Sequence, residues 1–98
     1  MEEKIMLLIV HSGEARSCAM EAITAAKQGK MEEAEKLIAK ANAELSEAHN
    51  TQTALIQAEA GGEKVPMSLL MVHAQDHFMT SMTVKDLAVE LIEVYKRL

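Results

Sequence analysis

The chain has 98 residues, which is enough for one domain and too few for two. Only 2% of the residues are aromatic, glycine and proline are scarce, and there is one cysteine, so we exclude an all-β sandwich and a disulfide framework. The net charge of −5 and the lack of a basic cluster in the sequence argue against nucleic acid or anionic membranes as partners. The first apolar run, residues 5–10, is too short for a secretory leader or a membrane span, so we expect a cytoplasmic protein without direct membrane insertion.

Two breaks divide the chain into three long segments rich in Ala, Leu, Met, Glu and Lys. The first break is centred on Gly29, and the second runs from Gly61 to Pro66. We predict helices over residues 2–28, 31–60 and 66–97, with Gly29 ending the first helix and Pro66 opening the third. Short links between long helices predict an all-α, antiparallel three-helix bundle that occupies residues 1–98 as a single domain.

The first two predicted helices have apolar residues at helical spacing. Those of the first helix are Ile5, Leu8, Ile9, Ala15, Ala19, Ala22, Ile23 and Ala26, and those of the second are Ile38, Ala41, Leu45, Ala48 and Leu55, with Gln52 in the same row. Gly13 interrupts the first helix, and a glycine there permits the close approach of another backbone. Because so many of these residues are alanines, the core of one chain is small, and we expect the protein to form an oligomer.

The third predicted helix has an unbroken heptad row that is apolar at its C-terminal end and polar at its N-terminal end. The row is Leu70, His73, His77, Thr80, Val84, Leu87, Leu91, Val94 and Leu98. Consecutive polar residues in a packing row lower stability unless a partner or a function compensates for them.

The polar part of this row belongs to the cluster His73, Gln75, Asp76 and His77. Asp76 is the only formal charge between Pro66 and Val84, in a stretch that is apolar nearly all round, which favours a helix covered by other subunits. A neutral imidazole attacks phosphorus or binds a metal ion, so the cluster permits a nucleophilic or a metal site. Histidines that are only packed in the core are the remaining interpretation.

Residues 69–80, LLMVHAQDHFMT, followed by 82–88, MTVKDLA, resemble the signature of the lactose/cellobiose-type IIA component of the bacterial phosphoenolpyruvate-dependent sugar phosphotransferase system. Residues 13–22 and 47–57 resemble the first and second helices of this family, although Glu14 stands where the family has Asn. The segment 59–64 is more similar to cellobiose and other β-glucoside members than to lactose members.

The resemblance implies a homotrimer, a nine-helix bundle, in which His73 takes a phosphoryl group from the phosphocarrier HPr and passes it to a cysteine of the cognate IIB component, which serves the membrane IIC component. It also implies that Asp76 from each of three subunits binds a divalent metal ion, magnesium, at the trimer axis. We expect His77 and Gln75 to donate hydrogen bonds to the phosphoryl group. The alternatives are a metal-stabilised helical trimer that acts as a scaffold, and a plain metal-binding bundle that uses His73, Asp76 and His77 as ligands.

Overall fold

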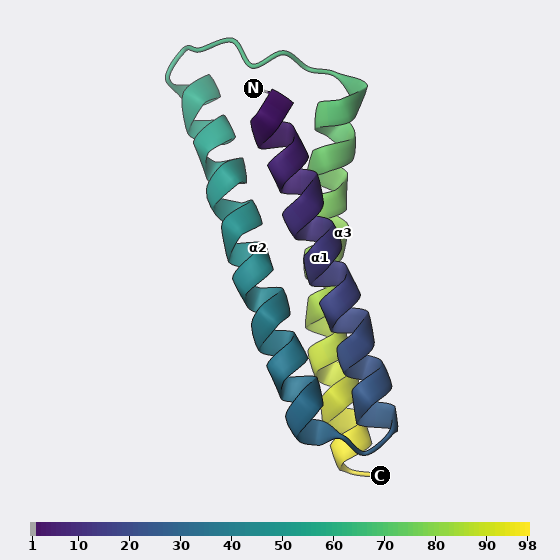
Figure 1. Ribbon diagram of the computed structural model, residues 1–98. Coiled ribbons are helices and arrows are strands. Elements are labelled where there is room, and N and C mark those ends of the chain that lie inside the picture. The colour runs from purple at the N-terminus through teal and green to yellow at the C-terminus, as the bar shows by residue number, and fades with distance from the viewer. Residues whose placement is uncertain (1) are drawn as a thin grey trace.

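A computed structural model describes residues 2–98 and consists, over that range, of three helices: α1 (Glu2–Lys27), α2 (Met31–Ala60) and α3 (Leu69–Lys96). They form a rod of 52 × 21 × 18 Å in which α2 runs antiparallel to both α1 and α3 (Figure 1). The predicted all-α three-helix fold is confirmed. Between residues 2 and 98, no helix is both long and apolar enough to cross a membrane.

Glycines end the first two helices in the same way. Gly29 has a φ of 78°, and beside it the Lys30 N–H donates to the Ala25 carbonyl at 2.9 Å. Gly62 has a φ of 94°, and the Glu63 N–H donates to the Ala58 carbonyl at 3.1 Å. Both are Schellman motifs, which need a residue in the left-handed region directly after the helix. The helix dipole of α1 also interacts favourably with charged side chains at both ends, with Glu2 and Glu3 in the first turn and Lys27 in the last.

The predicted start of the third helix is wrong by three residues. Pro66 lies in the connecting loop, and α3 begins at Leu69 with Ser68 as its N-cap. The backbone of Ser68 is extended, and its hydroxyl accepts a hydrogen bond from the Met71 N–H at 3.1 Å. This cap satisfies an N–H that would otherwise lack a partner, and proline has no such side chain to offer. The other predicted helix bounds differ from the observed ones by at most one residue.

The core of the bundle consists of small residues around a few large ones. Phe78 and Leu8 are the largest fully buried apolar side chains, and they belong to a cluster in the half of the rod that contains His73. The second cluster, towards the C-terminal end of α3, is mainly alanine: Ala22, Ala25, Ala26, Ala34 and Ile92. Small side chains let the helices approach closely but bury little apolar area, as expected from the composition.

Most of the heptad row of α3 does not pack against α1 and α2. The residues of α3 that are buried within one chain are Met71, Ala74, Phe78, Ser81, Ala88 and Ile92. Leu87, Leu91 and Val94 of the predicted row are 59%, 43% and 54% exposed. A row of large apolar side chains therefore remains on the surface of the single chain, next to the polar cluster.

Candidate functional site

Two histidines lie side by side on α3. His73 is exposed, and His77, one helical turn later, is half-buried. Their rings are stacked, with centroids 5.8 Å apart and an angle of 10° between the planes. The pair therefore presents one imidazole that a partner protein can reach, supported by a second imidazole whose position is more constrained.

His77 contacts the first helix at Gly13. A Cβ atom placed on Gly13 would lie 3.3 Å from Nε2 of His77. The sequence predicted the close approach of another backbone at this glycine, and that prediction is wrong in kind, because the group that lies there is the His77 side chain. A shallow hollow beside this contact is bordered by Arg16 and Ser17 of α1 as well as by His77. Its lining also includes the carboxylates of Glu14 and Glu21, so Arg16 is accompanied there by two acidic side chains.

Asp76 lies on the exposed side of α3 and is exposed itself. Val72 and Met79, one turn away on either side, are 51% and 53% exposed. Within residues 2–98 no group of three or more His, Cys, Asp or Glu side chains is arranged to bind a metal ion. One chain therefore supplies at most a single carboxylate here, and a complete set of oxygen ligands for a divalent cation requires further copies of the chain.

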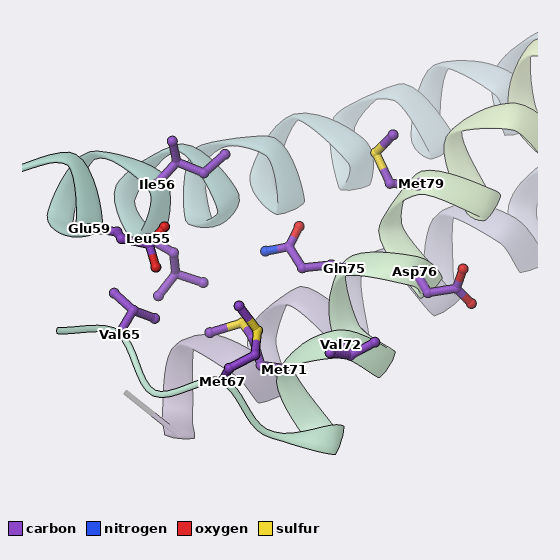
Figure 2. Close-up of a pocket in the computed structure, with 10 residues that line it drawn as sticks. All are labelled: Leu55, Ile56, Glu59, Val65, Met67, Met71, Val72, Gln75, Asp76 and Met79. Carbon is purple, nitrogen blue, oxygen red and sulfur yellow. The ribbon is translucent and has the colours of Figure 1, made fainter.

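Gln75 is held on the side of α3 that faces α2. Its side-chain oxygen accepts a hydrogen bond from Nε2 of Gln52 at 2.7 Å. Gln75 borders an apolar groove of about 460 Å³ whose lining also includes Leu55 and Met71. Figure 2 shows Gln75 pointing towards this groove and Asp76 pointing away from it. Residues two apart on a helix differ by about 200° in direction, so within one chain the structure brings His73 and His77 together but not His73 and Gln75.

A polar contact between α1 and α2 lies two residues before Gly13. Nδ1 of His11 is 2.6 Å from Oε2 of Glu44, and both side chains are half-buried. The two residues are separated by 33 positions, so no local sequence pattern indicates that they meet. The contact helps to fix the part of α1 against which His77 lies.

Residues 3–96 match the sequence family described as "PTS system, Lactose/Cellobiose specific IIA subunit". The chain belongs to this IIA family. It is 60% identical over 98 residues to the lichenan-specific phosphotransferase enzyme IIA component of Bacillus subtilis (strain 168), covering 100% of this chain and 89% of that protein. The crystal structure of the cellobiose-specific enzyme IIA from Bacillus anthracis superimposes with a TM-score of 0.96 at 54% identity, covering 98% of this chain and 88% of the other.

A second similar structure is the IIA component in the solution complex of chitobiose-specific IIA with HPr from Escherichia coli. The TM-score is 0.85 at 46% identity, and the match covers 98% of this chain and 93% of that one. The predicted family is thus confirmed, and this IIA chain is a phosphotransferase component of a sugar phosphotransferase system. The matches do not favour the scaffold alternative, because these relatives are themselves phosphotransferase components.

Proposed function

We propose that His73 is the residue that carries the phosphoryl group in this IIA chain. The observation that supports this choice is the difference between the two histidines: His73 is exposed, and His77 is half-buried against α1. A relay between proteins needs a nucleophile that two large partners reach in turn, and His73 meets that requirement better than His77. The neutral imidazole keeps a lone pair for attack near neutral pH.

The donor in the proposed reaction is phospho-HPr. A lone pair of the His73 ring attacks the phosphorus atom, a new N–P bond forms, and the N–P bond to the donor histidine breaks with its electron pair remaining on the donor ring. In the second step, a cysteine thiolate of the cognate IIB component attacks the same phosphorus and His73 leaves. In both steps the protein mainly positions the groups and stabilises charge on the phosphoryl oxygens.

His77 is proposed to donate a ring N–H to a phosphoryl oxygen while it supports the His73 ring. Arg16 borders the same hollow as His77 and contributes a cation to that lining, beside the carboxylates of Glu14 and Glu21. The oxygen of Gln75 is engaged by Gln52, and its NH₂ group remains able to donate. Since Gln75 faces away from His73 of its own chain, we propose that any support it gives goes to the phosphoryl group of a neighbouring subunit.

We further propose that the IIA chain works as a trimer that binds magnesium. The exposed apolar row of α3, including Leu87, Leu91 and Val94, supports self-association, because large apolar side chains in such a row gain stability when covered. Asp76 continues this exposed surface. Three copies of one carboxylate repel one another and offer oxygen ligands to a hard cation, so a divalent ion such as Mg²⁺ both neutralises and links them.

The proposed sugar is cellobiose or a related β-linked disaccharide. Support comes from similarity to the lichenan-specific component of B. subtilis at 60% identity and to the cellobiose-specific enzyme of B. anthracis at 54% identity. A relative named for lactose, from Lactococcus lactis, is 42% identical over 90 residues. A deletion strain that loses growth on cellobiose and keeps growth on lactose would agree with this choice, and the reverse pattern would contradict it.

The phosphocarrier function is tested by incubating the purified chain with phosphoenolpyruvate, Enzyme I and HPr. The expected product is one phosphate per chain, labile in acid and stable in base, which are the properties of phosphohistidine. Transfer should require all three components. A chain that binds HPr but never gains phosphate would contradict the proposal and return the scaffold alternative to consideration.

A further inference from the structure

Gly13 lies inside a continuous helix whose backbone does not require glycine. α1 is continuous from Glu2 to Lys27, and within residues 2–98 the glycines with positive φ are Gly29 and Gly62. A glycine inside a helix lowers stability relative to alanine, because the unfolded chain has more freedom to lose. We therefore expect a neighbouring group that can lie close to position 13 only because the Cβ is missing.

That group is the His77 ring. Within residues 2–98, and leaving out the neighbouring backbone of α1, one heavy atom lies within 4 Å of a Cβ built on Gly13. It is Nε2 of His77, at 3.3 Å. This separation is tighter than most contacts of real Cβ atoms, so an alanine would displace the His77 ring by a few tenths of an ångström. His77 also stacks on His73, with centroids 5.8 Å apart, so a displacement of His77 alters the geometry of the pair.

We propose that Gly13 is a positioning residue for phosphoryl transfer. By lacking a Cβ it lets the half-buried His77 ring lie against α1, where the ring holds its orientation relative to His73. This inference rests on the proposed role of His73 and His77. It goes beyond that role because it assigns to the first helix a residue that touches neither the phosphoryl group nor His73.

The proposal predicts that stability and activity change in opposite directions when Gly13 is replaced. Gly13→Ala should raise the midpoint of thermal unfolding by up to about 5 °C, because alanine favours the helix. The same variant should transfer phosphate from phospho-HPr about three- to tenfold more slowly, since small errors in the position of a supporting group reduce transition-state stabilisation. A glycine that serves packing alone would show no slower transfer.

The matched control is Asn42→Ala, an exposed position within α2. This variant should also raise the unfolding midpoint, since alanine favours a helix more than asparagine does, and it should leave the transfer rate unchanged. A direct readout of the ring comes from NMR: the His77 imidazole resonances should shift in Gly13→Ala and stay in place in Asn42→Ala.

A double-variant cycle tests whether Gly13 acts through His77. In a His77→Ala background the ring is gone, so adding Gly13→Ala should cause no further loss of rate. A transfer rate for Gly13→Ala equal to that of the unmodified chain overturns the inference, and so does a failure of this variant to fold or an equal loss in both backgrounds. If the unmodified chain accepts no phosphate at all, the proposed function itself fails, which is a different result.

Discussion

Replacing His77 with alanine separates a role in transfer from a role in packing. The His77 ring is half-buried between the His73 ring and Gly13 of α1, which has no Cβ. The centroids of the two histidine rings are 5.8 Å apart. A hydrogen bond to a charged oxygen contributes about 1.5–3 kcal/mol, so its loss should slow phosphoryl transfer to or from His73 by about one to two decades. Truncating a half-buried ring should also cost about 1–2 kcal/mol of stability.

The two effects are distinguished by rapid-quench measurement of transfer from phospho-HPr, with each rate divided by the concentration of folded protein. His77→Gln is the matched variant, because its amide still donates a hydrogen bond, and it should recover part of the lost rate. If His77 serves packing alone, the alanine variant will lose stability yet transfer phosphate at the normal rate. That result would remove His77 from the site.

Three further predictions concern the core, the thiol and the subunit contact. Phe78→Ala should lower the free energy of unfolding by about 3–5 kcal/mol in a urea titration, since Phe78 is 1% exposed, and a loss below about 1 kcal/mol would contradict its central place in the core. Burial raises the pKa of the Cys18 thiol, so less thiolate is present at pH 8 in the folded chain. Alkylation of Cys18 should therefore be at least about 100-fold slower in the folded chain than in the chain unfolded in urea, and equal rates would refute this. Asp76→Leu should abolish stoichiometric binding of Mg²⁺ and leave the trimer intact in sedimentation, because it removes the metal ligands together with the repulsion between the carboxylates. Loss of the trimer, or retention of the metal, would contradict the proposed site at the trimer axis.

The features of the fold that follow from local patterns were predictable. Gly29 marks the end of α1 because a Schellman motif needs positive φ, and the buried positions Ala15, Ala41 and Leu45 follow from helical spacing. The start of α3 was misplaced because both Pro66 and Ser68 are suitable near a helix start. The hydrogen bond that Ser68 makes decides between them.

Features that depend on contacts between helices were not predictable in the same way. In α3 two rows of residues have helical spacing, and the row that includes Leu87 and Leu91 is the exposed one, whereas the row that includes Phe78 is buried. The Gln52–Gln75 hydrogen bond joins helices at positions 23 residues apart. Of the site, the pair His73 and His77 could be predicted because it lies within one helical turn, whereas the direction of Gln75 depends on a partner in another helix.

The most direct test of the proposed relay is the position of the phosphate on the chain. After incubation with phosphoenolpyruvate, Enzyme I and HPr, peptide mapping at alkaline pH, at which phosphohistidine is stable, should place a single phosphate on His73. The variant His73→Gln should keep the helical content and the oligomeric state of the unmodified chain and accept no phosphate. One phosphate per chain on His73→Gln would contradict the assignment and make His77 the acceptor.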